Sequence, residues 1–195
     1  MAGNQMGTIP SPATAVHVRS GPYWLSAFDE SLASLVVGWV VDASELFWLA
    51  PKTPPPLTAA KVLAWSGPDS SPRMFCREGL AEPLGYLELN PMPGETGHLW
   101  LGHCLIRPDC RGRGLGRLMV KLILEEAFGQ RRAGRVSLVV FPDNLAAIRC
   151  YRAIGFEDAG QQVKYFLTTG RHHRMVRMEM DKARYELIYP RPEPS

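Results

Sequence analysis

The sequence predicts a single α/β (mixed α+β) domain in which one sheet carries helices on both faces. Short alternating or β-branched segments recur between residues 15 and 180, and stretches with apolar residues at helical spacing separate some of them. The chain has 195 residues, 46% of them hydrophobic, which is enough for one core and too little for two comfortable ones. We therefore expect one domain over residues 15–182, with a flexible tail over residues 1–14 and another over residues 183–195.

The first half of the chain predicts a strand, a helical region and a meander of three strands. Residues 15–20 alternate as a strand does. From Leu25 to Trp48 apolar residues recur at helical spacing, and Asp42 or Ser44 is the expected cap of a second short helix. Thr58 is the expected cap of another short helical turn. The three meander strands are residues 73–78, 83–90 and 98–106.

The second half predicts a helix, a buried strand, a second helix and a hairpin. The helices are expected over residues 115–128 and 143–156, the second with Asp143 or Asn144 as its cap and Gly155 as its terminator. The strands are residues 135–141, 161–169 and 171–180, the last two joined at Gly170. His172 and His173, beside that turn, are expected to be solvated and are not assigned to a metal site.

Composition and spacing exclude several functional classes. A net charge of +3 is too small for a nucleic-acid-binding surface. The N-terminus does not read as a signal peptide, and the apolar run of residues 34–41 is too short to span a bilayer. Single cysteines without a CxxC pair favour reduced thiols and no metal; they are Cys76, Cys104, Cys110 and Cys150. We expect a cytoplasmic protein, monomeric or homodimeric, without nucleic-acid or membrane partners.

A loop rich in glycine and arginine, residues 107–117, links the third meander strand to the following helix. Its glycines let successive backbone N–H groups point into one cavity, and the helix adds partial positive charge at its N-terminus, a combination suited to phosphate. Arg117 occupies the positions where a Walker loop needs lysine and where a dinucleotide fingerprint needs its third glycine, so both nucleotide motifs fail. The surrounding arginines are Arg107, Arg111, Arg113 and Arg117.

Together with residues further along the chain, this loop resembles the GNAT superfamily, the GCN5-related N-acetyltransferases. The matching residues are Arg111, Gly114 and Gly116 in the loop, then Asn144, Ala147, Tyr151 and the pair Gly155-Phe156. In motif detail the resemblance covers about residues 99–156, and the order of elements extends it to roughly 16–180. It implies a GNAT fold, with a mostly antiparallel twisted sheet of about seven strands that splays apart between strands 4 and 5.

The same resemblance implies that acetyl-CoA is the cosubstrate and binds in that splayed cleft. The backbone of Cys104, Leu105 and Ile106 would pair with the pantetheine arm, and Asn144 would reach the other side of the cofactor. Tyr151 would contact the thioether sulfur and act as general acid. The amides that would hold the pyrophosphate belong to Arg111, Gly112, Arg113, Gly114, Leu115 and Gly116.

The residues themselves agree with direct acetyl transfer to an amine. A thioester is already activated, so transfer needs alignment and proton handling and assigns no nucleophilic role to the cysteines. The acceptor amine must lose a proton before it attacks, and Glu88 and His103 are the candidate bases, with a water chain as the alternative.

The acceptor pocket is expected in the aromatic first half of the chain. Glu45, Trp48 and Glu88 are candidates for it, although packing in the core and an exposed helical carboxylate explain such residues equally well. The aromatic residues of this half are Tyr23, Trp24, Trp39, Phe47, Trp48 and Trp65. The leading hypothesis is an N-acetyltransferase acting on a primary amine of a small molecule or peptide. The alternative is a catalytically silent acyl-CoA-binding module of the same fold.

Overall fold

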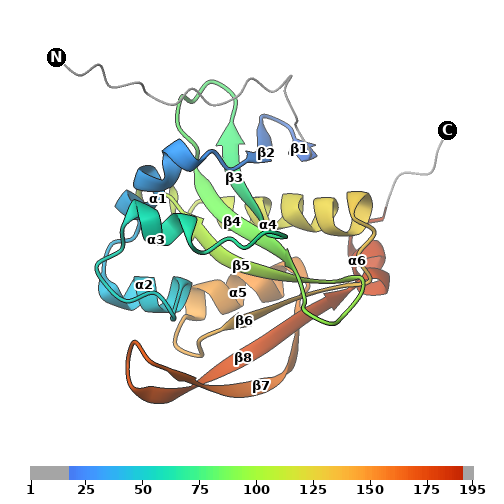
Figure 1. The fold of residues 1–195 in the computed structure, drawn as a ribbon. Coiled ribbons are helices and arrows are strands. Elements are labelled where there is room, and N and C mark those ends of the chain that lie inside the picture. Colours follow the sequence, from blue (N-terminus) through green and yellow to red (C-terminus); the bar gives the residue numbers. More distant parts are fainter. Residues whose placement is uncertain (1–17, 191–195) are drawn as a thin grey trace.

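The structure is a computed structural model that describes residues 18–190 (Figure 1). The expected tail at residues 1–14 and the start of the first strand lie outside the described residues. The strands are β1 Val18–Ser20, β2 Tyr23–Ala27, β3 Ser71–Arg77, β4 Gly85–Pro91, β5 His98–Ile106, β6 Arg135–Val140, β7 Glu157–Phe166 and β8 Arg171–Asp181. The α-helices are α1 Ala33–Trp39, α2 Ala43–Leu49, α3 Ala59–Leu63, α4 Leu115–Glu125, α5 Leu145–Ile154 and α6 Lys182–Ile188. Short 3-10 turns cover Glu30–Leu32 and Pro108–Cys110, and a π-helical turn, Glu126–Gln130, follows α4.

One mixed sheet of eight strands runs through the molecule in the order β1-β2-β3-β4-β5-β6-β8-β7. Neighbouring strands are antiparallel except β5 and β6, which are parallel. This architecture confirms the predicted mixed α/β class, and the sheet has one more strand than the sequence indicated.

The additional strand is β2, which replaces the start of the long helix expected from Leu25. Trp24 and Leu25 are both buried, on opposite faces of the strand, and β2 pairs with β3 along its whole length. A helix would place these adjacent side chains on neighbouring flanks, whereas a strand sends them into two separate cores. The helical part therefore begins at Ala33 and is divided into α1 and α2, with Asp42 as the cap of α2.

Helices cover both faces of the sheet, as the sequence predicts (Figure 1). On one face α4 and α5 pack over the central strands through residues such as Met119, Leu122 and Ile148. On the other face α1 and α3 cover a second cluster that includes Val36, Val62 and Tyr86. The central strands of the sheet are thus packed between two apolar layers. Because their faces are covered, a binding site is expected at the ends of these strands.

The expected tail from residue 183 is wrong for its first part, because α6 forms there. Asp181 caps α6 by accepting a hydrogen bond from the Arg184 amide, and the Tyr185 ring stacks on Phe128 at 4.6 Å. The Tyr189 hydroxyl then donates to the Ile154 carbonyl, 2.8 Å away. These contacts join the C-terminal segment to α4 and α5.

A buried carboxylate joins β3 to the end of α4. Glu126 is 2% exposed and receives two hydrogen bonds from Arg73, at 2.8 and 3.0 Å, and others from Arg131. Burial alone would raise the pKa of Glu126, but the two guanidinium groups outweigh it and hold that pKa below its ordinary value. The carboxylate therefore stabilises the folded state above its unfolded-state pKa, and this contribution is lost as the pH falls through the lower folded-state pKa.

We expect Glu126→Gln to lower the free energy of unfolding by about 3 kcal/mol at neutral pH, because two arginines lose a buried partner. Chemical denaturation between pH 3 and 7 measures this, and the difference from the unmodified protein should shrink as the pH falls. Glu125→Gln, the adjacent exposed carboxylate, is the matched control and should have little effect. Stability curves for Glu126→Gln and the unmodified protein that remain parallel down to pH 3 would contradict this assignment.

Candidate functional site

The cavity at the centre of the site arises because β5 and β6 separate after three paired positions. His98, Leu99 and Trp100 pair with β6, and the last pair is Trp100 with Ser137. Beyond it, β5 continues to Ile106 and keeps its antiparallel pairing to β4 alone. The resulting cavity has a volume of about 950 Å³, and residues 100–106 form one wall of it. One backbone edge of β5 therefore faces open space over the segment in which the sequence predicts cofactor pairing.

The glycine loop lies beside this cavity and begins α4. Gly112 and Gly114 have φ values of 74° and 77°, the left-handed region that glycine adopts without strain. No heavy atom lies within 4 Å of a Cβ built at either position, so the backbone conformation explains these glycines and packing does not. Within the described part of the chain, the N–H groups of residues 112–116 have no protein acceptor. The loop thus presents a run of free donors at a helix N-terminus, a geometry suited to a phosphate group.

Arg111 fixes this loop to the helices in front of the cavity. Its guanidinium donates to the carbonyls of Ile106 and Trp39, and it lies 2.7 Å from a carboxylate oxygen of Glu45. The other Glu45 oxygen accepts a hydrogen bond from the Val41 amide. Glu45 lines the cavity, as the sequence predicts for the acceptor pocket, but its charge is already matched by Arg111.

The other three arginines of the loop differ in whether their side chains have an acidic partner. Arg107 forms ion pairs with Asp109 and Glu82. Arg113 and Arg117 are exposed. Arg107 and Arg111 are thus already paired with carboxylates, which leaves the backbone amides and two exposed arginines as the candidate donors for an anion.

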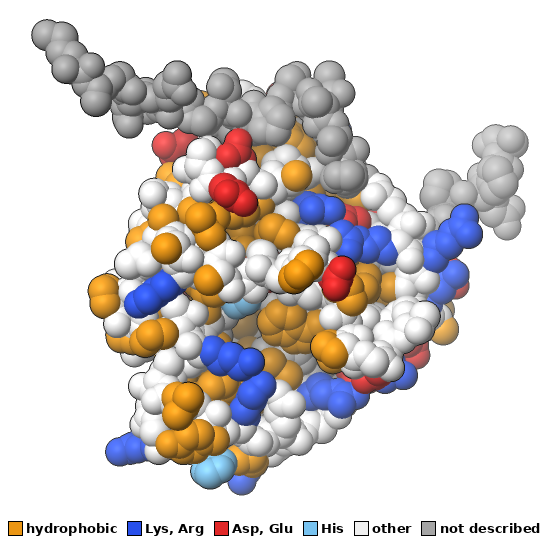
Figure 2. All heavy atoms as spheres, viewed as in Figure 1, with side chains coloured by type: hydrophobic (Ala, Val, Ile, Leu, Met, Phe, Trp, Pro, Cys, Tyr) orange, Lys and Arg blue, Asp and Glu red, His pale blue; other side chains and the backbone are white. Residues whose placement is uncertain are grey.

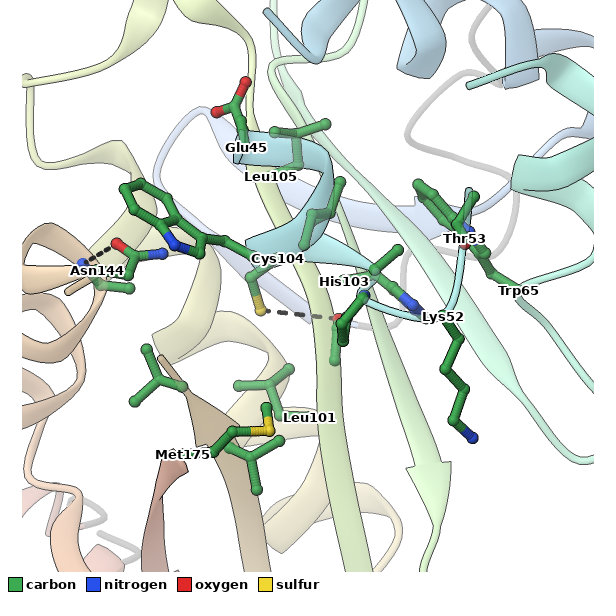
Figure 3. Close-up of a pocket in the computed structure, with 18 of the residues that line it drawn as sticks. Glu45, Lys52, Thr53, Trp65, Leu101, His103, Cys104, Leu105, Asn144 and Met175 are labelled. Atoms are coloured by element: carbon green, nitrogen blue, oxygen red, sulfur yellow. Dashed lines mark hydrogen bonds between the residues drawn. The ribbon is translucent and has the colours of Figure 1, made fainter. Parts of the chain in front are cut away.

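Helix α5 supplies the wall opposite β5. Asn144 caps this helix by accepting a hydrogen bond from the Ala147 amide at 3.1 Å, so its side-chain amide group stays available to the cavity (Figure 3). Gly155 ends the helix with a φ of 113°. Tyr151, one helical turn beyond Ala147, lines the same cavity, and its hydroxyl lies near the Cys104 thiol. The residues of β5 and α5 that the sequence assigns to the cofactor thus line the same cavity.

Burial determines the protonation of both groups in that contact. Burial raises the pKa of Cys104 to about 12, against a smaller opposing effect of the Tyr151 hydroxyl. Burial, with the nearby Cys104 and Cys150 thiols, also raises the pKa of Tyr151 well above its ordinary value. At neutral pH the site therefore holds a protonated thiol and a protonated phenol.

A bulge in β5 turns His103 toward β4. Glu88 pairs with Gly102 and Tyr86 pairs with Leu105, so one residue of β4 faces two residues of β5. His103 has a φ of 50°, a left-handed conformation that costs a non-glycine residue about 1 kcal/mol. Its ring stacks on Trp65, with centroids 4.7 Å apart and planes 9° apart, and it meets the edge of Trp100. The surrounding rings thus hold one orientation of the imidazole at the cavity wall.

Behind the imidazole lies Glu88, which is fully buried. Its carboxylate accepts hydrogen bonds from Tyr86, at 2.5 Å, and from Ser66 and Asn90, and one oxygen lies 3.2 Å from His103 Nδ1. Burial would raise the pKa of Glu88, but His103 and the hydroxyl and amide donors outweigh it and lower that pKa. Glu88 does not line the cavity, so the structure places it behind His103 and not in the acceptor pocket.

The aromatic residues of the first half divide between core and cavity. Tyr23 stacks on Phe75, and Trp24 and Trp39 are buried in the core. Trp48 and Trp65 line the cavity. Fewer aromatic side chains of the first half therefore line the cavity than the sequence analysis expected.

The expectation that His173 is solvated is wrong. Its ring packs against Phe47, Phe141 and Phe166, joining α2 to the hairpin of β7 and β8. A second link between the same elements is the hydrogen bond from the Thr168 hydroxyl to the Pro51 carbonyl, at 2.5 Å. Helix α2 therefore extends over the cavity from the glycine loop on one side to the hairpin on the other.

Trp100 is one of the pocket residues that the sequence analysis did not identify; Lys52, Lys164 and Met175 are others. A Cβ built on Gly102 would lie 2.1 Å from the Trp100 ring, so the ring rests directly on the strand backbone. A glycine inside a strand pattern indicates a bulge or a close approach, and Gly102 carried that signal.

We expect Gly102→Ala to lower the free energy of unfolding by about 1–3 kcal/mol, because the new methyl group collides with the Trp100 ring. Thermal or chemical denaturation of four proteins tests it: unmodified, Gly102→Ala, Trp100→Ala and the double variant. The alanine should cost much less stability in the Trp100→Ala background, where the ring is absent. An equal cost in both backgrounds would show that another contact requires this glycine.

Within residues 18–190 no helix is long and apolar enough to cross a membrane. The same part of the chain contains no group of three histidine, cysteine, aspartate or glutamate side chains placed to hold a metal ion.

Similar proteins include several acetyltransferases. The chain is 31% identical over 67 residues to spermine/spermidine N(1)-acetyltransferase of Bacillus subtilis strain 168, which covers 34% of this chain and 44% of that protein. It is 29% identical over 113 residues to spermidine N(1)-acetyltransferase of Escherichia coli K12, covering 56% and 59%. A third match, 37% identical over 65 residues, is to N-alpha-acetyltransferase RimI of Mycobacterium tuberculosis, covering 33% and 39%. The chain thus spans less than two thirds of these curated relatives.

Solved structures share the fold over most of this chain. Spermidine N-acetyltransferase from Vibrio cholerae, in complex with CoA and spermine, superposes with a TM-score of 0.71 at 16% identity, covering 85% of this chain and 99% of that one. A probable GNAT-family acetyltransferase from Chromobacterium violaceum gives 0.72 at 18% identity, covering 87% of each chain. The model of the acetyltransferase (GNAT) family matches residues 39–156, more than half of the chain, from the last residue of α1 to just beyond α5. The protein therefore belongs to the GNAT acetyltransferase family.

Proposed function

We propose that the protein transfers the acetyl group of acetyl-CoA directly to a primary amine of a small molecule or peptide. The observation that carries this proposal is one cavity lined by a free edge of β5, by Tyr151 and by His103, with Arg111 of the glycine loop at its wall and the free amides of the following residues next in the chain. Relatives named for acetylating spermidine and spermine, and one named as an N-alpha-acetyltransferase, support an amine as the acceptor.

The chain's own groups fit coenzyme A at one end of this cavity. The free amides of residues 112–116, with the positive end of the α4 dipole, provide donors for a pyrophosphate. The unpaired edge of β5 at Cys104, Leu105 and Ile106 provides backbone partners for an extended amide-containing arm. Asn144 contributes its free side-chain amide from the other wall.

His103 is the base in this proposal, and Glu88 is its positioning residue. The imidazole lies at the cavity wall and takes the proton of the acceptor ammonium, directly or through water. Glu88, charged and enclosed by its donors, holds the Nδ1 side of the ring and balances the charge gained there. The free amine then attacks the thioester carbonyl, so that a C–N bond forms and the C–S bond breaks.

Tyr151 protonates the departing thiolate, and the second proton that the nitrogen loses as it becomes an amide returns to Tyr151 through water, which closes the proton balance. The raised pKa keeps the phenol protonated at neutral pH, and Tyr151 lines the cavity beside Cys104. Cys104 stays a thiol because of its own raised pKa, which favours direct transfer over an acyl-cysteine intermediate. Acid and base thus face one cavity, an arrangement that favours an enzyme over a silent acyl-CoA-binding module.

The proposal includes a metal-free reaction, a monomer or homodimer, and a cytoplasmic location. The four free cysteines support that location, because thiols persist in a reducing compartment.

We expect Tyr151→Phe to lower kcat for thiol release from acetyl-CoA by about 100-fold, because the leaving thiolate loses its proton donor. Coenzyme A should raise the melting temperature of this variant as much as that of the unmodified protein, because the phosphate-binding loop is unchanged. Tyr165→Phe, an exposed tyrosine on β7, is the matched control. Unchanged turnover in Tyr151→Phe would remove the acid role.

We expect His103→Ala to lower kcat/KM by about 100-fold at pH 7, with a deficit that narrows as the pH approaches the pKa of the amine, about 10. At high pH the acceptor is already deprotonated, so loss of a base matters less. The measurement is a pH–rate profile from pH 6.5 to 9.5, with His172→Ala, an exposed histidine, as the control. A deficit that stays constant across this range would assign His103 to structure.

A further inference from the structure

The cavity wall carries more positive than negative charge. Its charged side chains are Glu45, Lys52, Lys61, Arg111 and Lys164. Glu45 and Arg111 form an ion pair with each other, and the Lys61 ammonium donates to the carbonyls of Pro54 and Pro56. Lys52 and Lys164 are exposed and, among residues 18–190, their ammonium groups form no hydrogen bond or ion pair. Two lysines at this cavity therefore have no anionic partner from the described chain.

A polycation finds no free carboxylate in the same cavity. Glu45 already pairs with Arg111, and Glu88 is fully buried behind His103 with its own set of donors. A second ammonium on the acceptor would meet lysines without a compensating carboxylate, and like charges in a confined space repel. Polyamines, which appear in the names of several relatives, therefore have a positive charge that the cavity lining does not compensate.

The two lysines line the same cavity as His103 and Trp65. In Figure 3, Lys52 and Glu45 lie in different parts of this cavity, and Glu45 pairs with Arg111 of the glycine loop. Lys164 alternates along β7 with Gln162 and Phe166, so these three side chains share one face of the strand and line the cavity. Figure 2 shows the hollow on this face with basic side chains at its edge and hydrophobic side chains inside.

We propose that the acceptor is a small molecule that carries a carboxylate near its primary amine, and that Lys52 and Lys164 bind this carboxylate while the amine faces His103. This inference rests on the proposed function and specifies its substrate class. Apolar lining by Trp48, Trp100 and Met175 suits an acceptor whose remaining part is hydrophobic, so an amino acid with an apolar side chain combines all three features.

Matched acceptors test the charge requirement. The assay measures thiol release from acetyl-CoA with L-phenylalanine, L-phenylalaninamide and 2-phenylethylamine, with L-leucine and 3-methylbutylamine, and with spermidine. The two amino acids should show kcat/KM values at least about tenfold above those of their carboxylate-free counterparts and of spermidine, because two charge-assisted contacts are gained. The amine of the amide loses its proton more readily than that of the amino acid, so basicity alone would give the reverse order.

Variants of Lys52 and Lys164 test whether these side chains cause the preference for a carboxylate-bearing acceptor. Lys52→Gln and Lys164→Gln should each lower kcat/KM for L-phenylalanine by about threefold or more, through KM, and leave 2-phenylethylamine within about twofold. Lys52→Arg should retain most of the activity. Lys182→Gln, an exposed lysine on α6, is the control. The increase in melting temperature caused by coenzyme A should be the same in all variants; a smaller increase in both glutamine variants would assign these lysines to the cofactor and overturn the proposal.

A binding measurement separates failure of this inference from failure of the proposed function. Calorimetry in the presence of coenzyme A compares N-acetyl-L-phenylalanine with N-acetyl-2-phenylethylamine, and the anionic compound should bind at least about tenfold more tightly. If the amines react as well as the amino acids, or both acetyl compounds bind equally, the carboxylate assignment is wrong while acetyl transfer stands. If no amine releases thiol but the anionic compound binds more tightly, acetyl transfer is wrong and the anion preference of the cavity stands.

Discussion

The site depends on the early end of pairing between β5 and β6. The parallel ladder is held where it begins, because His98 Nε2 and Ser137 Oγ lie 2.8 Å apart in a buried contact and Gly97 accepts two amides from residues 134 and 135. It stops at Trp100, and the two strands diverge from there. Both strands remain paired on their other edges, to β4 and β8, so the sheet is open only where the cavity lies. The strands β5 and β6 are therefore held firmly in the sheet and still present an unpaired backbone edge to the cavity.

The features around this opening are local departures from regular structure, each supported by packing. The bulge turns His103 toward Glu88, and its left-handed conformation persists because Trp65 and Trp100 enclose the ring. The left-handed residues Gly112 and Gly114 have no such packing requirement and leave amides free instead. His103 is thus held in a strained conformation by its neighbours, whereas the glycines adopt theirs without strain. This difference is consistent with the proposed roles, an acid–base side chain at His103 and phosphate binding by the backbone of the loop.

The sequence predicts correctly those features that depend on neighbouring residues, such as helix caps and the glycine loop. Caps such as Asp42, Thr58 and Asn144 form as expected, and the motifs of the glycine loop and of α5 predict the two elements that flank the cavity. The strand at Trp24 and Leu25 was missed because its apolar spacing fits a helix as well, and only the two cores decide between them. The relation of His103 to Glu88, and the position of Trp100, depend on the pairing register of β4 with β5, which no local pattern contains.

The position of α2 connects the two ends of the cavity. Through Glu45 and Arg111 it is attached to the glycine loop, and through Phe47 it is attached to the hairpin that carries Lys164. The segment that leaves α2 adds the Pro51 contact to this hairpin and supplies Lys52. A displacement of this helix would therefore act on the glycine loop and on the opposite cavity wall together. If these are the cofactor and acceptor subsites, as we propose, a single helix that contacts both is a physical means of aligning two substrates for direct transfer.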